Sequence, residues 1–271
     1  MHFVVCVKQV PDTTEVRIDP ETNTLVREGV PSIINPYDIH AAEAAVELKE
    51  RYGGTVTVVC MGPPQANDVL RECISLGADR GILLSDRAFA GSDTWATSYT
   101  IGLALMRLRD EQGLDMVLCG KQAIDGDTAQ VGPGLARRLG IPQITYAVGV
   151  ESIDVSGGRA RVLRHLEKGV EVVDAALPCL LTCVKEMNEI RYASMPNMIR
   201  AARYKAEMWT KADVPARDEL LGLKGSPTVV SRIFPPPARQ PGTIIAGGDE
   251  DPARAAEELV DRLVAHLGVE A

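Results

Sequence analysis

The sequence DMVLCGKQAIDGDTAQVGP, at residues 115–133, decides the fold. Residues 115–119 predict a short apolar strand of the kind that is buried on both faces of a parallel sheet. Glycines and short polar residues follow at once and lead into a helical pattern. A strand that passes through such a loop into a helix is the unit from which α/β folds are built.

Strand and helix signals alternate through the rest of the first half. Strands are expected at residues 3–7, 55–60, 81–84 and 115–119. Helices are expected between them at residues 36–52, 65–76 and 92–110, with Asn35 as a side-chain cap and Pro36 in the first turn of the first helix. This spacing implies right-handed crossovers and a mostly parallel sheet that is covered by helices on both faces.

The second half is richer in strands. Strands at residues 144–150, 160–166 and 170–175 predict a hairpin-like extension of the same sheet, and residues 177–184 predict another strand. Residues 235–237 are three prolines, which force an extended backbone. A last helix is expected at residues 252–267. The fold is therefore α/β, with a domain at residues 1–207 and a C-terminal arm and helix at residues 208–271.

Composition excludes several classes of protein. The chain has 271 residues, with 29 basic and 37 acidic side chains and a formal net charge of −8. This acidic balance disfavours binding to nucleic acid or to an anionic membrane surface. No apolar run approaches the roughly 18–20 residues that span a bilayer. The apolar run at residues 3–7 is too short for a signal peptide, so a cytoplasmic location is expected.

The cysteines and histidines do not predict a metal or redox centre. The six cysteines include no C-x-x-C pair. Cys179 and Cys183 lie four residues apart on a predicted strand, about 13 Å, which is too far for one disulfide or one zinc ion. We therefore expect reduced, buried thiols, and no metal ligands among the four scattered histidines.

The loop after the fourth predicted strand is the strongest candidate site. It leaves the carboxyl end of a parallel strand, where open α/β sheets bind ligands, and it feeds a helix whose free N–H groups attract anions. The helix begins either after Asp127, as in a capping box, or near Gly132, with Pro133 in its first turn. The loop binds a nucleotide pyrophosphate or is simply a tight strand–helix connection. Neither a Walker loop nor a G-x-G-x-x-G motif occurs.

Five ordered segments resemble the beta subunit of electron-transfer flavoproteins. They are VCVKQVPD at 5–12, INPYD at 34–38, GADRG at 77–81, GKQAIDGD at 120–127 and RYASMPNMI at 191–199. The resemblance implies an adenine-nucleotide-binding, Rossmann-like fold and a partner alpha subunit that carries FAD. In one branch of the family the beta pocket holds AMP, and in the electron-bifurcating branch it holds a second FAD.

Residues 126–133 look like those of the bifurcating branch, because Gly126 and Ala129 are small. That branch implies that NADH reduces the beta-bound FAD. One electron then passes to ferredoxin or flavodoxin and the other, through the alpha-subunit FAD, to a dehydrogenase. The alternatives are a single-flavin electron carrier with structural AMP, which serves acyl-CoA-type dehydrogenases, and a nucleotide-binding module without a redox role.

The resemblance also assigns site residues, and it implies no catalytic acid, base or nucleophile in this chain. The backbone of residues 126–130 and the Thr128 hydroxyl are expected to bind the pyrophosphate. The full set of expected cofactor-binding residues is Cys6, Lys8, Asp12, Asn35, Tyr37, Asp38, Met61, Gly120, Ala123, Asp125, Gly126, Asp127, Thr128, Ala129, Gln130 and Val131. Several of them follow or end predicted strands at one edge of the sheet, where each taken alone is more often structural.

Residues 192–201 correspond to the family's partner-recognition loop, in which an exposed leucine docks into a dehydrogenase. Met195 occupies that position here. The expected partner-binding residues are Tyr192, Met195, Pro196, Asn197 and Met198. The alternative is a loop–helix junction whose methionines pack internally. The C-terminal arm and helix are expected to contact the alpha subunit, with packing onto this chain itself as the alternative.

Overall fold

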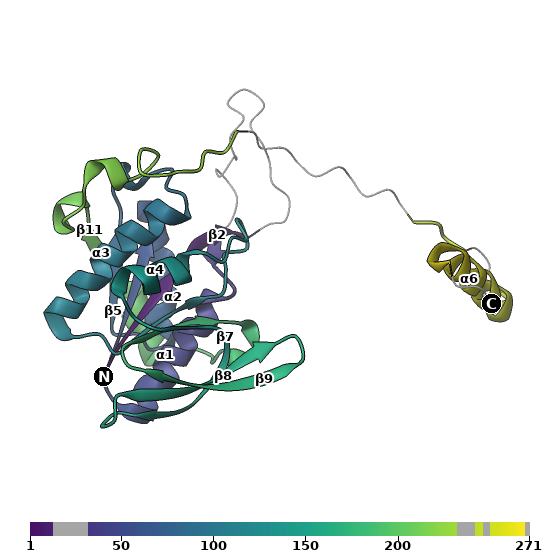
Figure 1. The fold of residues 1–271 in the computed structure, drawn as a ribbon, viewed down its shortest axis with the longest axis horizontal. Helices are drawn as coiled ribbons and strands as arrows, with labels where there is room; N and C mark the ends of the chain where they lie inside the picture. Colours follow the sequence, from purple (N-terminus) through teal and green to yellow (C-terminus); the bar gives the residue numbers. More distant parts are fainter. Residues whose placement is uncertain (13–31, 232–241, 246–249, 269–271) are drawn as a thin grey trace. The chain divides into compact units, whose positions relative to one another are not determined.

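The computed structural model describes residues 1–12, 32–231, 242–245 and 250–268 (Figure 1). Its main sheet has nine strands in the order β11-β5-β4-β1-β6-β10-β7-β8-β9, and β2 and β3 form a separate pair. The strands of the main sheet are β1 His2–Val7, β4 Thr55–Met61, β5 Arg80–Leu84, β6 Met116–Gly120, β7 Gln143–Asp154, β8 Arg159–Leu166, β9 Gly169–Ala176, β10 Cys179–Cys183 and β11 Glu207–Trp209. The small pair is β2 Gln9–Pro11 and β3 Ser32–Ile34.

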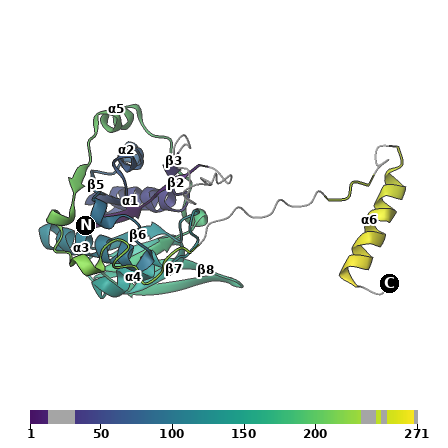
Figure 2. The same ribbon diagram turned by 90° about the horizontal axis from the view of Figure 1, so that it is seen from above.

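Helices cover both faces of the parallel part of the sheet (Figure 2). They are α1 Asp38–Tyr52, α2 Asn67–Leu76, α3 Thr94–Gln112 and α4 Val131–Leu139, and α5 Met195–Arg203 packs against α2. The central strand β1 is buried along its whole length. Phe3 and Val5 pack in the core with α1 and α2, whereas Val4 packs in the core with α3 and α4. A strand with a helix layer on each side has no polar face, which explains the continuous apolar runs in the sequence.

The sheet has the predicted mostly parallel arrangement. From β11 to β7 every neighbouring pair of strands is parallel. The pairs β7–β8 and β8–β9 are antiparallel, so the hairpin-like extension is also confirmed. The strands β4 and β5 lie on one side of β1, whereas β6 lies on the other. The chain therefore reverses its direction of growth between β1 and β6, and such a switch point opens a crevice at the carboxyl ends of the two strands.

Two predictions about helix starts are resolved by local geometry. Helix α1 begins at Asp38 without a side-chain cap, so the predicted Asn35 cap is wrong, and Pro36 lies before the helix. The main-chain oxygen of Asn35 accepts the N–H of Asp38 instead, at 2.8 Å. Helix α4 begins at Val131, which places Pro133 in its first turn and excludes a start after Asp127. Proline is tolerated there because the N–H groups of the first turn have no partner within the helix.

Contacts divide the chain into residues 1–233 and residues 234–271. The second unit contains α6 Pro252–Leu267, which matches the predicted helix and is capped by the Asp251 carboxylate. The predicted extended backbone at residues 235–237 lies outside the described residues. The proposed domain boundary after residue 207 stays a prediction. Among the described helices, none has the length and apolar character needed to cross a membrane.

Candidate functional site

Asp38 connects the ends of the two strands at the switch point. Its Oδ2 accepts the N–H of Lys8, just after β1, at 2.8 Å. Its Oδ1 accepts the N–H of Gly120, at the end of β6, at 2.9 Å. The residue is only 6% exposed. Burial raises the pKa of this carboxyl to about 7, against the lowering effect of hydrogen bonds from Asn35, Lys8 and Gly120.

Gly120 has no room for a side chain. A Cβ there would overlap the Asp38 carboxylate and would lie 2.6 Å from the Cβ of Tyr37. The start of α1 therefore packs directly against the backbone at the end of β6. The glycine that ends the predicted strand is explained by this close approach.

Asn35 holds the loop that follows β6. Its Nδ2 donates to the main-chain oxygen of Gln122 at 2.8 Å, and its Oδ1 accepts the N–H of Ile124 at 3.2 Å. The Asn35 side chain is buried, and the main-chain N–H of this residue donates to the main-chain oxygen of Lys8 at 2.9 Å. The Asn35 side chain thus provides hydrogen-bond partners for loop backbone groups that have no neighbouring strand to pair with.

A solvent-exposed ion pair connects the end of β1 to the same loop. The Lys8 ammonium lies 2.6 Å from the Asp125 carboxylate, and the Lys8 side chain is 48% exposed. The fold brings these two predicted site residues together although 117 positions separate them. Each charge is then satisfied within the protein.

The backbone at residues 126–130 has an unusual conformation. Asp127 and Ala129 have positive φ angles, 49° and 54°, on either side of Thr128. Non-glycine residues in the left-handed region are uncommon and cluster at functional sites. Turns of this kind form concave groups of N–H donors that bind anions. The Thr128 hydroxyl is exposed and forms no hydrogen bond with another described residue.

The loop ends at the N-terminus of α4, whose first N–H groups carry a partial positive charge. Gln130 precedes this helix, and its Oε1 accepts the Thr94 hydroxyl at 2.8 Å. Thr94 is the first residue of α3, so the loop is fixed to two helices. Nothing in the sequence near residue 94 pointed to this contact.

Of the remaining predicted cofactor-binding residues, three belong to this strand edge or its loop, and one forms no bond with the described residues. Cys6 and Met61 end or nearly end their strands at this edge, and burial raises the pKa of the Cys6 thiol so that it stays neutral. The main-chain oxygen of Ala123 closes the turn by accepting the N–H of Asp127 at 2.9 Å. Asp12, by contrast, is exposed beyond β2 and bonds to none of the described residues.

A cationic and aromatic cluster flanks the loop. The ammonium groups of Lys121 and Lys185 lie 5.6 and 5.5 Å from the centre of the Tyr37 ring. Lys121 also lies 5.1 Å from the ring of Tyr146, a residue with a φ of 58°. The sequence predicted Tyr37 as a site residue, but not Lys121, Tyr146 or Lys185. Lys121 is within the matched motif, whereas residues 146 and 185 offered no signal.

The segment at residues 192–199 presents apolar side chains to solvent. Tyr192 is fully exposed, Met195 is 68% exposed and Met198 is 51% exposed. These methionines therefore do not pack internally against the described residues. Ser194 caps α5 by accepting the N–H of Asn197. The segment is thus a defined helical turn with exposed side chains.

Two arginines fix the ends of this segment. Arg191 bonds to the buried Glu43 carboxylate at 2.7 Å and to Glu50 at 2.6 Å. Arg200 donates to the main-chain oxygens of Ile74 and Ala78 at 2.9 and 2.7 Å. The exposed turn is therefore attached at both ends to the α1 and α2 layer.

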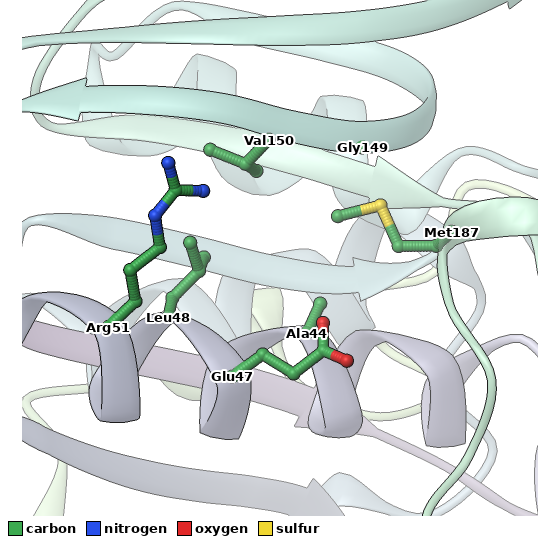
Figure 3. Close-up of a pocket in the computed structure, with 7 residues that line it drawn as sticks. All are labelled: Ala44, Glu47, Leu48, Arg51, Gly149, Val150 and Met187. Atoms are coloured by element: carbon green, nitrogen blue, oxygen red, sulfur yellow. The ribbon is translucent and has the colours of Figure 1, made fainter.

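A shallow hollow of about 300 Å³ lies away from the loop, between the second half of α1 and β7 (Figure 3). Leu48, Val150 and Met187 give it apolar walls, and Glu47 and Arg51 border it. Partial burial and the nearby Glu43 raise the pKa of Glu47. A wall that carries a carboxylate and has no free helix N-terminus does not suit a phosphate, so the carboxyl edge is the better nucleotide site.

All six cysteine thiols are buried and unpaired, as the sequence predicts. Within the described ranges, no group of three His, Cys, Asp or Glu side chains could hold a metal ion.

Comparison with known proteins agrees with this architecture. The electron transfer flavoprotein domain family matches residues 22–214. Protein FixA of Azotobacter vinelandii is 47% identical over 265 residues, covering 97% of this chain and 94% of the relative. Subunit CarD of the caffeyl-CoA reductase–Etf complex of Acetobacterium woodii is 51% identical over 248 residues, covering 91% and 92%. The electron transfer flavoprotein subunit beta of Clostridium acetobutylicum is 49% identical over 263 residues, covering 97% and 98%. The chain belongs to the electron transfer flavoprotein family, in which it is a beta-type subunit that pairs with an alpha subunit.

Proposed function

We propose that this chain is the FAD-binding beta subunit of an electron-bifurcating electron transfer flavoprotein. The observation that carries the proposal is the loop at residues 121–130, which follows the carboxyl end of β6 at the switch point and has left-handed residues on both sides of Thr128. When bound, FAD would supply the redox chemistry that couples NADH to ferredoxin or flavodoxin and, through the alpha-subunit FAD, to a dehydrogenase.

The residues of this chain fit the phosphate part of such a cofactor. The N–H groups at residues 128–130 and at the start of α4 supply donors, and the Thr128 hydroxyl supplies one more. The N–H groups of Gly126 and Asp127 donate to the main-chain oxygen of Ala123 and close the turn. A Cβ built at Gly126 meets no atom within 4 Å, which leaves open space beside the loop. Small residues at positions 126 and 129 therefore support a ligand larger than AMP. The chain binds and orients the cofactor, and no side chain is assigned as acid, base or nucleophile.

The exposed segment at residues 192–199 is the proposed docking site for a dehydrogenase. The apolar side chains of Tyr192, Met195 and Met198 are available, and a thioether adapts its shape to an apolar pocket. The relative named as a subunit of a caffeyl-CoA reductase complex supports a partner of this kind. The cytoplasmic location belongs to the same proposal, since buried, unpaired thiols suit a reducing compartment.

The experiment that tests the cofactor proposal is the nucleotide content of the purified heterodimer with its alpha subunit. An acid extract is separated by chromatography, and FAD and AMP are quantified against protein. Two FAD per heterodimer are expected. One FAD with one AMP would contradict the proposal and assign the chain to the single-flavin carriers.

The docking proposal is tested by electron transfer to the partner dehydrogenase. Met195→Glu should raise the KM for the dehydrogenase about tenfold or more, because it places a charge in an apolar contact. Met208→Glu is the matched control, since Met208 is 54% exposed on β11. Equal effects of the two variants would refute docking through residue 195.

A further inference from the structure

We propose that Asp38 is a positioning residue for nucleotide binding, which joins the ends of β1 and β6 and thereby sets the conformation of residues 120–124. The inference rests on the proposed function, because it concerns the same adenine-nucleotide site. It differs from a direct contact role, which the resemblance had suggested for this residue.

Burial of the Asp38 carboxylate, which is bonded to two backbone N–H groups, argues against a direct contact with a ligand. One oxygen accepts the N–H of Lys8 and the other accepts the N–H of Gly120, and the side chain is buried. These two N–H groups lie just after β1 and at the end of β6, which are neighbouring parallel strands. A carboxylate bonded to both fixes the distance between the two strand ends, which form the walls of the crevice.

The same short segment also holds the loop. Asn35, three residues before Asp38, bonds to the backbone of Gln122 and Ile124. The main-chain oxygen of Asn35 accepts the Asp38 N–H, so the two side chains are part of one turn. Gly120 lies against this turn without space for a Cβ. A shift of the Asp38 carboxylate is therefore transmitted to residues 120–124 through contacts that are already close.

The hydrogen bonds depend on the charge of the carboxyl group. An ionised carboxylate accepts two N–H groups, whereas a protonated one carries a hydroxyl that no longer accepts with full strength. Burial brings the pKa of Asp38 to about 7, so both forms occur near neutral pH. The other titratable groups that face it are the Lys8 ammonium and the buried thiols of Cys6, Cys60, Cys73, Cys119 and Cys183. Burial raises the pKa of each of these thiols, which leaves Asp38 as the group that titrates near pH 7.

The test is calorimetric titration of the full-length chain with AMP and, separately, with FAD between pH 6 and pH 8. Asp38→Asn keeps the volume but replaces one acceptor oxygen with an NH₂ group that faces an N–H donor. At pH 8 the variant should bind the nucleotide about tenfold more weakly than the wild type. The ratio of the two affinities should approach one at pH 6. The ligand's own titration cancels in this ratio.

Asp79→Asn is the matched control. The Asp79 carboxylate also accepts a strand N–H, that of Val56 at 2.8 Å, but at the opposite edge of the sheet. It should leave both the affinity and its pH dependence as in the wild type. Hydrogen exchange, measured by mass spectrometry, gives a second readout. Amides of residues 120–124 should exchange faster in Asp38→Asn and not in Asp79→Asn.

The outcomes separate this inference from the proposed function. Wild-type affinity and pH dependence in Asp38→Asn, or equal losses in both variants, would overturn the positioning role. Failure of the wild type to bind AMP or FAD would count against the proposed function, and exchange at residues 120–124 would then decide the inference. If Asp38→Asn does not fold, Asn35→Ala removes the two loop contacts instead, and unchanged exchange at Gln122 and Ile124 would overturn the inference.

Discussion

The parallel strands of the sheet begin at one side, the amino edge, and end at the other, the carboxyl edge. At each of these edges a carboxylate accepts a backbone N–H, but the surroundings of the two carboxylates differ. At the amino edge, the Asp79 carboxylate accepts a strand N–H, is 37% exposed and forms an ion pair with Lys49 at 2.8 Å. At the carboxyl edge, the Asp38 carboxylate accepts two backbone N–H groups, is buried, and forms no ion pair within the described ranges, where Lys8 pairs with Asp125. At the amino edge the Asp79 charge is compensated by Lys49 and is partly exposed. At the carboxyl edge, none of the described residues forms an ion pair with the buried Asp38 carboxylate. Folds tolerate the free-energy cost of such a group at functional sites, and this edge is the proposed site.

The largest expected effect is on the pH dependence of stability, with opposite signs at the two edges. Asp38 has a folded pKa of about 7, above its ordinary value near 3.9, so its stabilising contribution is greatest below pH 4 and is lost as the pH rises through 7. The loss should reach roughly 4 kcal/mol. At the amino edge, burial lowers the pKa of His2, whose Nδ1 donates to the oxygen of Gly113 at 2.6 Å. Its contribution is therefore lost as the pH falls below about 6.5.

Urea titrations from pH 5 to pH 8 measure both effects. The free energy of unfolding of the wild type minus that of Asp38→Asn should fall as the pH rises. The same difference for His2→Gln should rise with pH and level off above about pH 6.5. Parallel curves for the two variants would remove the contrast between the edges.

The second effect concerns the close contact at the end of β6. Gly120→Ala should lower the free energy of unfolding by about 3 kcal/mol, because the new Cβ overlaps the Asp38 carboxylate and approaches Tyr37. Gly126→Ala, in the same loop, should change stability by less than about 0.5 kcal/mol because its Cβ meets open space. Chemical denaturation of both variants checks this. A Gly120→Ala chain as stable as the wild type would show that α1 can move away from β6.

The third effect concerns ligand binding and leaves the strand ends unchanged. Thr128→Ala should weaken nucleotide binding by about 2 kcal/mol if the hydroxyl donates to a phosphate oxygen. Stability should not change, because the exposed hydroxyl has no hydrogen-bond partner among the described residues. Calorimetric titration with FAD measures the affinity. Unchanged affinity would remove Thr128 from the site.

The smallest effect is expected for the exposed ion pair between Lys8 and Asp125. Asp125→Asn should change the free energy of unfolding by less than about 1 kcal/mol, since the Lys8 side chain is 48% exposed and the pair is screened by salt. Denaturation at low and high salt gives the measurement. A salt-dependent loss larger than that of Gly120→Ala would mean that charge, rather than packing, fixes this edge.

Much of the fold could be predicted because burial on both faces leaves a plain signal in the sequence. The apolar run at residues 3–7 and the helix at residues 252–267 both correspond to observed elements. The error at Asn35 has a physical cause. An Asn before a helix is usually a cap, but here its amide is used 87 residues further on, at Gln122. Local patterns do not contain such long-range contacts.

The same limit applies to the site. The loop at residues 120–130 was identified from its place after a strand, a feature that sequence does show. The contact from Thr94 and the lysine at position 185 depend on which helices and turns meet at the edge. Asp38 was included for a contact role, but its hydrogen bonds to two strand ends require knowledge of the strand order.

The attachment of residues 192–199 at both ends has a consequence for the rate of the proposed partner docking. Because Arg191 and Arg200 fix the segment to the α1 and α2 layer, the proposed docking of a partner there would cost little backbone entropy. A surface that is already ordered can bind with a small contact area and still release its partner quickly. An electron carrier needs such short-lived complexes, because each partner must leave before the next one can dock.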